Sequence, residues 1–270
     1  MVVLFWLALW IRAHNITALP VFVDEGKHIA RATSIYHFNT HPAQESHGKF
    51  LFYFLPGVFD LTQPHSALFL GRISVALSAL LTVALVFLIA RTLAGEYAGL
   101  IAAAFYTLVP FAFFFERMAL ADPFAGLIAA ATVWFGWRFA RHPRRSTAVY
   151  LGIFMALAPA AKLTLAFVSA FPAPAILIWG YSASLRRLWE RYGRLSLLAL
   201  TVTALLWSLA IIPAMISYYA GTDYILYDPH LADVASGANS LPDLLKTSGV
   251  TGASPPLVIA SRLFCITTIG

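Results

Sequence analysis

Two adjacent carboxylates, Asp24 and Glu25, follow an apolar N-terminal stretch in a chain that carries few charges. Charged residues make up 11% of the sequence and hydrophobic residues 60%. An ionised side chain costs roughly 2.5–3.5 kcal/mol at the centre of a bilayer on insertion scales. A carboxylate pair at the edge of a membrane therefore predicts a functional site, and a pair of solvated loop acids is the alternative.

The residues after this pair fit a short helix. Helical spacing places Asp24, His28 and Arg31 on one face. Such a helix would lie along the membrane interface, with its acidic start at the positive end of the helix dipole. Asp24 would also be a good helix cap, and capping is compatible with catalysis.

A second candidate group is Lys49, which directly precedes the aromatic run 50–54. A lysine is a point charge suited to a phosphate, and the aromatic rings would sit at the depth of the lipid headgroups. The alternative is a snorkelling side chain, whose stem lies in lipid and whose ammonium lies in water.

A third group spans residues 116–123, where Asp122-Pro123 is typical of a helix start. If Asp122 and Asp24 converge in a partly dry pocket, each raises the pKa of the other and favours a general base. Arg117 would bind a phosphate oxygen in such a pocket.

Two further cations, Arg72 and Lys162, each stand alone in apolar surroundings. Snorkelling is the default interpretation for both, and a contact with an anionic headgroup is the other. Metal ligation is unassigned: a divalent metal stays an open alternative, but no spacing among the candidate ligands supports one. These candidates are His28, His47, His230, Glu25 and Glu45.

The elements that must position these groups are apolar helices. Mean hydropathy is +0.77, and apolar runs of about 17 residues or more recur, which is long enough to span a bilayer core. A transmembrane barrel would alternate apolar and polar residues, which these runs do not do. The sequence therefore predicts an all-α, polytopic transmembrane helical bundle.

Transmembrane spans are expected at 68–91, 97–115, 121–140 and 195–216, with a hairpin of two spans over 147–182 that turns near Lys162. A first span would begin in the stretch 1–11 and is either clipped or runs on towards Leu19, giving about seven spans in a core of residues 1–216. Residues 20–67 would form an extracytoplasmic first loop with short interfacial helices. The tail 217–270 would be extracytoplasmic and lead to a truncated further span, as in an N-terminal fragment of a longer protein.

Charge predicts the orientation of this bundle. The net charge of +6 comes from basic residues in short clusters between apolar spans, which is typical of cytoplasmic membrane loops rather than of nucleic-acid binding. With Arg91 and the basic clusters at 138–145 and 186–194 inside, Asp24, Glu25, Glu45, Glu116 and Asp122 all fall on the extracytoplasmic face.

In this order, the candidate residues resemble the GT-C superfamily, the polytopic glycosyltransferases that use lipid-phosphate sugar donors. The similarity is to the branch of protein mannosyltransferases and of aminoarabinose transferases, which modify lipid A. It rests on motifs along residues 1–215: Asp24-Glu25 after the first helix, Gly48-Lys49-Phe50-Leu51 without the family's two prolines, Arg72, Arg117 with Asp122-Pro123, and Lys162.

The resemblance implies an enzyme that transfers a sugar from a polyprenyl- or dolichyl-phosphate to an acceptor hydroxyl of a protein, lipid or glycan. The chain would be a multi-pass protein of the plasma (inner) membrane. The implied catalytic residues are Asp24, Glu25 and Asp122, with Asp24 as the base. The implied phosphate-binding residues are Lys49, Arg117, Arg72 and Lys162.

The alternative from another class is a transporter or flippase for an anionic or lipid-linked solute. A transporter typically has polar groups near the membrane midplane, on broken helices. The expected spans are nearly free of charge there, although Pro110, Pro159, Pro172 and Pro174 could break helices. A non-catalytic membrane scaffold is a third interpretation.

Overall fold

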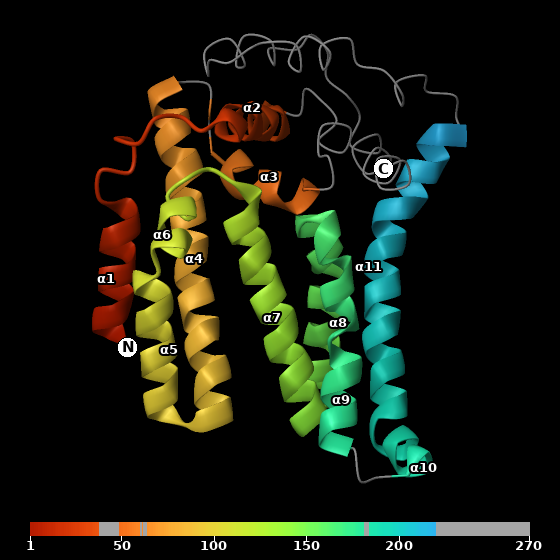
Figure 1. Cartoon of the computed structure of the whole chain (residues 1–270). Coiled ribbons are helices and arrows are strands. Elements are labelled where there is room, and N and C mark those ends of the chain that lie inside the picture. The colour runs from red at the N-terminus through yellow and green to blue at the C-terminus, as the bar shows by residue number, and fades with distance from the viewer. Residues whose placement is uncertain (38–48, 60, 62–63, 181–183, 220–270) are drawn as a thin grey trace.

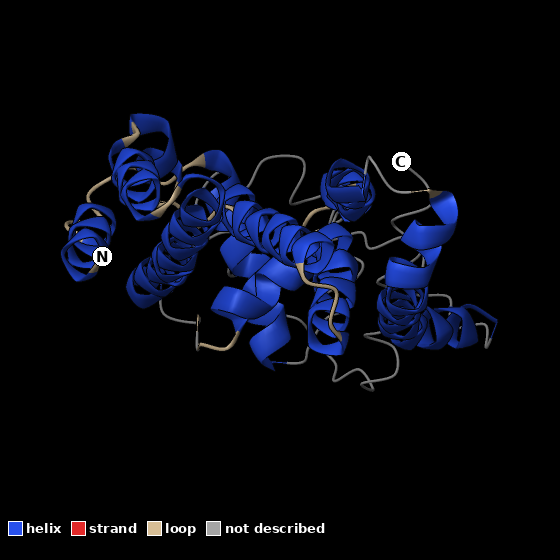
Figure 2. Ribbon diagram, turned by 90° about the horizontal axis from the view of Figure 1, so that it is seen from below, coloured by secondary structure: helices blue, strands red, loops and turns tan. Residues whose placement is uncertain are grey.

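The computed structural model describes residues 1–37, 49–59, 61, 64–180 and 184–219, and every regular element in that part of the chain is a helix (Figure 2). The prediction of an all-α protein is confirmed. In chain order the elements are α1 (Val2–Ala13), α2 (Val23–His37), α3 (Phe50–Gly57), α4 (Pro64–Ala94), α5 (Glu96–Leu108), α6 (Pro110–Phe115), α7 (Ala121–Arg141), α8 (Arg145–Ala161), the 3-10 helix η1 (Leu163–Ala170), α9 (Pro172–Gly180), α10 (Leu185–Leu188), the π-helix η2 (Trp189–Gly193) and α11 (Arg194–Tyr219).

The long helices stand side by side, while α2 and α3 lie across one end of the row (Figure 1). Helix α4 packs against α1, α5 and α7, and α8 packs between α7 and α11. Apolar residues of α2, α3, α4, α7 and α8 form one buried cluster beneath that end. The short helices α2 and α3 are therefore fixed on top of the bundle by the same hydrophobic core that joins the long helices.

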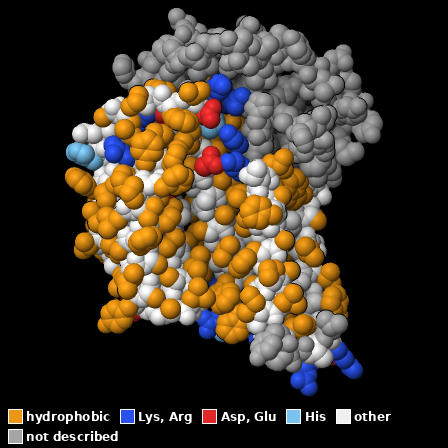
Figure 3. All heavy atoms as spheres, in the orientation of Figure 1, with side chains coloured by type: hydrophobic (Ala, Val, Ile, Leu, Met, Phe, Trp, Pro, Cys, Tyr) orange, Lys and Arg blue, Asp and Glu red, His pale blue; other side chains and the backbone are white. Residues whose placement is uncertain are grey.

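Two described stretches are long and apolar enough to cross a membrane, Ser66–Ala94 and Leu163–Gly180. Shorter apolar helices occupy Val2–Ala13 and Arg145–Ala161. Hydrophobic side chains cover most of the visible flank of the bundle, and charged side chains gather near its two ends (Figure 3). This distribution suits an apolar environment around the middle of the helices.

Two expected helices differ from the structure. Helix α1 ends at Ala13, and His14 has extended backbone angles, so the expected continuation towards Leu19 is wrong. The expected span 97–115 is interrupted at Val109, which is extended at φ −59° and ψ 117°. The cause is Pro110, because a proline disfavours helical geometry in the residue before it and lacks the N–H that would continue the helix.

The other expected helices are confirmed in outline. The hairpin expected within 147–182 is present in the described residues up to Gly180: α8 ends at Ala161, and Lys162 has extended angles, φ −160° and ψ 126°. The chain returns through η1 and α9. Helix α7 agrees with the expected 121–140, and α11 contains the expected 195–216. Lys162 is therefore held at the turn of a helical hairpin, as its isolation between apolar runs predicts.

Candidate active site

Helix α2 places its two adjacent carboxylates in different surroundings. Asp24 is exposed, whereas Glu25 is 0% exposed. Because an α-helix has 3.6 residues per turn, neighbouring residues face directions about 100° apart. His28, one turn beyond Asp24, is buried, and the Asp24 carboxylate has a small raising effect on its pKa. Only Asp24 of the acidic pair can therefore meet a molecule that arrives from outside.

The carboxylate of Glu25 accepts hydrogen bonds at both oxygens. Oε1 accepts from Arg72 Nε at 2.8 Å and from the Ala119 backbone N–H at 2.7 Å. Oε2 accepts from Arg72 Nη2 at 2.7 Å and from the Phe22 backbone N–H at 2.8 Å. The geometry gives no support to the predicted catalytic role of Glu25, because both of its oxygens are occupied and closed off from solvent.

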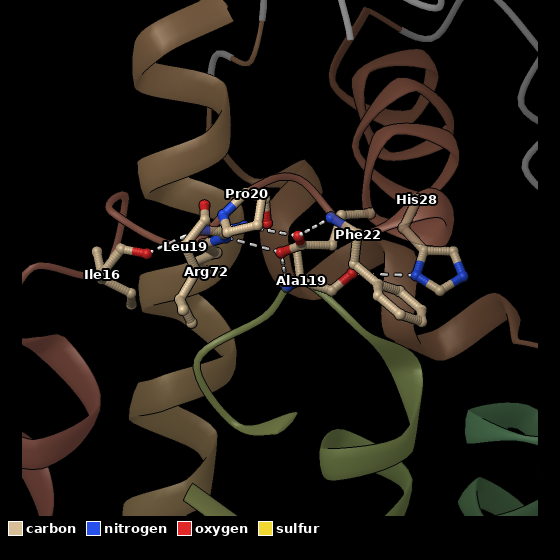
Figure 4. Close-up of polar contacts among 8 residues, drawn as sticks. Ile16, Leu19, Pro20, Phe22, His28, Arg72 and Ala119 are labelled. Carbon is tan, nitrogen blue, oxygen red and sulfur yellow. Dashed lines mark hydrogen bonds and ion pairs between the residues drawn. The ribbon is translucent and has the colours of Figure 1, made fainter. Parts of the chain in front are cut away.

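Arg72 is equally enclosed, at 0% exposure. Besides the bonds to Glu25, its guanidinium donates from Nη1 to the carbonyls of Ile16 at 2.7 Å and Leu19 at 3.0 Å, and from Nη2 to that of Pro20 at 3.0 Å (Figure 4). The predicted contact between Arg72 and a donor phosphate is thus not supported in this conformation. Arg72 instead fixes the connection between α1 and α2 against α4.

Ala119, in the connection between α6 and α7, binds α2 through both of its backbone groups. Its N–H donates to Glu25, and its carbonyl is 3.0 Å from Nδ1 of His28 (Figure 4). Glu25 and His28 are three residues apart and so lie on one side of α2. The connection that carries Arg117 and leads to Asp122 is therefore fastened to the helix that carries Asp24. The sequence offered no signal for this contact, because alanine has no polar side chain.

Lys49 lies immediately before α3, and two acids and two cations act electrostatically on its ammonium. It is half-buried, and burial lowers the pKa of its ammonium, while the carboxylates of Asp24 and Asp122 raise that pKa. The cations of Lys162 and Arg31 lower the same pKa. We call these residues, Asp24, Arg31, Lys49, Asp122 and Lys162, the charged cluster.

Lys162 and Asp122 form an ion pair within the charged cluster. Lys162 stands at the turn of the α8–η1 hairpin, and Asp122 lies in the first turn of α7. The cap of α7 is Leu120, so Asp122 is not the cap residue that its position before Pro123 predicted. The side chain of Asp122 is 63% exposed. Helix α7 begins at the end of the bundle that α2 crosses (Figure 1).

Arg117 turns towards the end of α1. Its Nη2 donates to the carbonyls of His14 at 2.7 Å and Asn15 at 3.1 Å. Its Nε is buried and has no hydrogen-bond partner in the part of the chain that the structure describes. The predicted phosphate contact of Arg117 stays a prediction, because its described hydrogen bonds direct the guanidinium to the end of α1.

Arg12 and Glu116 form a second buried ion pair, which was not predicted from the sequence. Arg12 of α1 donates from Nε to Oε2 of Glu116 at 2.6 Å, and the Tyr106 hydroxyl donates to Oε1 at 2.6 Å. Arg12 is 0% exposed and Glu116 2%. The available signal was the presence of one lone base and one lone acid in apolar stretches, because buried charges in such surroundings are almost always paired.

Basic residues gather at the opposite end of the bundle. Arg141, in the last turn of α7, donates to the Thr92 carbonyl at the end of α4 and lies 5.2 Å from the ring centroid of Trp179. Figure 3 shows basic side chains at this lower end and acidic and basic side chains together at the upper end. The predicted separation of the basic clusters from Asp24 and Asp122 is therefore present in the fold.

No group of three or more His, Cys, Asp or Glu side chains that could hold a metal occurs in the described ranges. Glu25, one of the predicted alternatives for a metal ligand, is engaged by Arg72. Three other candidates, His47, His230 and Glu45, lie outside the described residues, as do Gly48 of the predicted motif and the tail from residue 220.

Residues 46–207 match the family model described as dolichyl-phosphate-mannose-protein mannosyltransferase. This is more than half of the 270 residues. The matched segment includes Lys49, Arg72, Arg117, Asp122 and Lys162, and it begins after α2. Comparisons with curated proteins and with solved structures gave no match. The match confirms the resemblance to GT-C glycosyltransferases.

Proposed function

Because the chain belongs to the dolichyl-phosphate-mannose-protein mannosyltransferase family, we propose that it transfers a sugar from a polyprenyl- or dolichyl-phosphate to an acceptor hydroxyl at the extracytoplasmic face of a membrane. The family implies a glycosyltransferase with a lipid-linked sugar donor. The acceptor would be a hydroxyl of a protein, a lipid or a glycan.

The observation that carries the assignment to a site is the charged cluster. The carboxylates of Asp24 in α2 and Asp122 in α7 act electrostatically on Lys49 at the start of α3, and Asp122 pairs with Lys162 of the α8–η1 hairpin. Four separate elements contribute, and the fold holds α2 in place through Glu25 and Ala119. An exposed acid within electrostatic range of half-buried cations is suited to sugar transfer from a phosphate.

In this reaction the acceptor oxygen attacks the anomeric carbon of the sugar. The bond between that carbon and the phosphate oxygen breaks, and the lipid phosphate leaves with the electron pair. Asp24 takes the proton of the acceptor hydroxyl as general base. Lys49 stabilises the negative charge that develops on the leaving phosphate, and Lys162 assists once the phosphate competes with Asp122 for its ammonium.

The remaining predicted residues support these groups. Asp122 orients Lys162 and the acceptor. Arg117 would bind the phosphate only after its guanidinium leaves the carbonyls of His14 and Asn15. Glu25 and Arg72 are positioning residues in this proposal, because each is fully buried and saturated with hydrogen bonds. They set the place of Asp24 by fixing the first turn of α2.

The exposed apolar flank of the bundle supports a location in a membrane. A donor with a polyprenyl chain must reach the site from lipid, and apolar side chains such as Trp6, Trp10 and Phe105 are exposed on the flank of the bundle. We propose a multi-pass protein of the plasma (inner) membrane, with the charged cluster at the outer face. The basic end near Arg141 would then lie on the cytoplasmic side, in agreement with the positive-inside rule.

Transfer of radioactivity from a labelled polyprenyl-phosphate sugar to membrane protein, lipid or glycan, in membranes that contain the full chain, tests this function. We expect wild-type membranes to transfer the label and Asp24→Asn membranes to lose the activity, since asparagine keeps the size but cannot take a proton. Glu96→Gln is the matched control, because Glu96 is an exposed acid in the first turn of α5. Equal transfer by Asp24→Asn and wild type would reject Asp24 as the base.

A further inference from the structure

His28 is a buried histidine that the proposed reaction does not use. It is 3% exposed, and its ring packs against Phe52 and Tyr53, with centroids 5.3 Å and 5.8 Å away. Both ring nitrogens have polar partners: Nδ1 lies 3.0 Å from the Ala119 carbonyl oxygen, and Nε2 lies 3.3 Å from Nζ of Lys49. The ring therefore bridges the α6–α7 connection and the start of α3.

The partners determine where the proton of this ring resides. A carbonyl oxygen can only accept, so Nδ1 must carry the hydrogen. The ammonium of Lys49 can only donate, so Nε2 must offer its lone pair. Only the neutral imidazole with its hydrogen on Nδ1 satisfies both contacts. Burial and the nearby Lys49 and Arg31 lower the pKa of His28 to about 4, against a smaller opposing effect of Asp24 and the Ala119 carbonyl.

This contact holds the ammonium of Lys49 among the acids of the charged cluster. A lysine side chain is long and rotates freely, so one fixed acceptor restricts where its charge lies. The carboxylates of Asp24 and Asp122 both raise the pKa of this ammonium. A phosphate bound here would meet a cation whose position is fixed before binding, which reduces the cost of ordering it.

We infer that His28 is a positioning residue, which holds the Lys49 ammonium through Nε2 and so orients the cation for the phosphate of the lipid-linked donor. The inference rests on the proposed function for the identity of the anion, and on the contacts of His28 for the positioning. His28 touches neither the sugar nor the acceptor in this account and acts only through Lys49.

Two substitutions distinguish the roles of the two ring nitrogens of His28. His28→Asn places an amide near the position of Nδ1 and keeps a donor for Ala119, but it removes the acceptor for Lys49. His28→Gln reaches the position of Nε2 and restores that acceptor. We expect His28→Asn to slow transfer roughly tenfold, as for loss of one bond to a charged group, and His28→Gln to recover a large part of the rate. Equal losses in both variants would contradict the inference.

A second measurement is independent of transfer activity. The pH dependence of acylation of the Lys49 amine can be followed by mass spectrometry in the full chain, with Lys27 as an internal reference. An acceptor favours the charged ammonium, so we expect His28→Asn to lower the pH at which Lys49 becomes reactive. His28→Gln should leave that pH close to the wild-type value. If His28 only filled space, His28→Asn would reduce transfer activity but leave the pH at which Lys49 becomes reactive unchanged.

A double-mutant cycle completes the test. If His28 acts through Lys49, His28→Asn should have no further effect on transfer in the Lys49→Ala background. Additive losses, together with an unchanged acylation profile of Lys49, would overturn the inference. If the wild-type chain transferred no sugar, the proposed function would fail, while the acylation profile would still decide whether His28 positions Lys49.

Discussion

Glu25 and Arg72 form a bidentate ion pair that is closed off from solvent. Nε of Arg72 is 2.8 Å from Oε1 of Glu25, and Nη2 is 2.7 Å from Oε2. Both side chains are 0% exposed. The pair joins the first turn of α2 to α4 across 47 residues of sequence, directly beside the exposed Asp24. In the proposed function, the buried Glu25 therefore positions α2, and the exposed Asp24 acts as the base.

Removal of one partner of this pair should be strongly destabilising. Glu25→Gln leaves the charge of Arg72 buried without a counter-charge, and breaking a buried pair in this way costs about 3–5 kcal/mol. We expect a lower midpoint of thermal unfolding for the purified protein in detergent. Asp24→Asn is the control, since it changes the neighbouring exposed acid and should leave the midpoint close to that of the wild type.

The double variant Glu25→Leu with Arg72→Met tests the backbone bonds of the pair. Apolar replacement of both partners removes the buried charges together, but it also leaves five backbone groups without partners: the carbonyls of Ile16, Leu19 and Pro20 and the N–H groups of Phe22 and Ala119. Because each unpaired buried group costs about 1–3 kcal/mol, we expect the double variant to be no more stable than Glu25→Gln. A more stable double variant would show that the unpaired charge of Arg72 in Glu25→Gln costs more than the loss of these backbone bonds. The midpoint of unfolding measures this directly.

The positions of the helices, and the ends of the helices at which charges lie, were predictable from the sequence. Both depend on the length of the apolar runs and on helix-breaking residues, which act locally. Lys162 between two apolar runs predicted the turn after α8, and the structure has it there. The interruption at Val109 was missed, although Pro110 signalled it.

The pairing of the charges was not predictable from local spacing. Arg12 meets Glu116 across 104 residues, and Arg72 meets Glu25 across 47. Snorkelling was the default interpretation of Arg72, and the family resemblance implied a phosphate contact; neither takes Glu25 as its partner. A carboxylate elsewhere in the apolar chain has the same need for an opposite charge, and packing of α2 against α4 decides which cation it meets.

Lys49→Ala should slow sugar transfer by about ten- to a hundredfold, because a bond to a charged group contributes roughly 1.5–3 kcal/mol. If the cation serves the leaving phosphate, kcat falls; if it binds the donor equally in ground and transition states, KM rises. Lys27→Ala is the matched control from α2, outside the charged cluster. Small and equal effects at both lysines would identify Lys49 as an interfacial anchor.

Gly152→Ala should destabilise the contact between α8 and α11. A Cβ at Gly152 would lie 2.4 Å from the carbonyl oxygen of Ala199 and 2.8 Å from Cβ of Val202. These are closer than van der Waals contact, and the first of them is backbone, so α8 and α11 must move apart. Overpacking of this kind costs about 1–3 kcal/mol.

Gly126→Ala is the control for that substitution. Gly126 lies within α7, and a Cβ there would meet nothing within 4 Å. Alanine is the better helix former by about 1 kcal/mol, so the unfolding midpoint should stay unchanged or rise. Equal midpoints for Gly152→Ala and Gly126→Ala would show that α8 and α11 are not closely packed at Gly152.

His28 should make the stability of the protein fall in acid. Burial is the main cause that lowers its pKa to about 4 in the folded protein, from an ordinary value of 6.5. Between these two values the unfolded chain binds a proton that the folded chain does not, so the free energy of unfolding decreases as the pH falls. Since one pKa unit corresponds to about 1.4 kcal/mol, the loss across this interval is about 3 kcal/mol.

The unfolding midpoint measured from pH 7 down to about pH 4 tests this expectation. His28→Gln removes the titrating ring and keeps an acceptor near Lys49, while the other acids and histidines titrate in both proteins. We therefore expect the wild type to lose more of its stability than His28→Gln over this range, and the two profiles to converge in shape above pH 7. Parallel profiles throughout would mean that His28 binds a proton equally well in the folded and unfolded chain, and that its ring is not held neutral between Ala119 and Lys49.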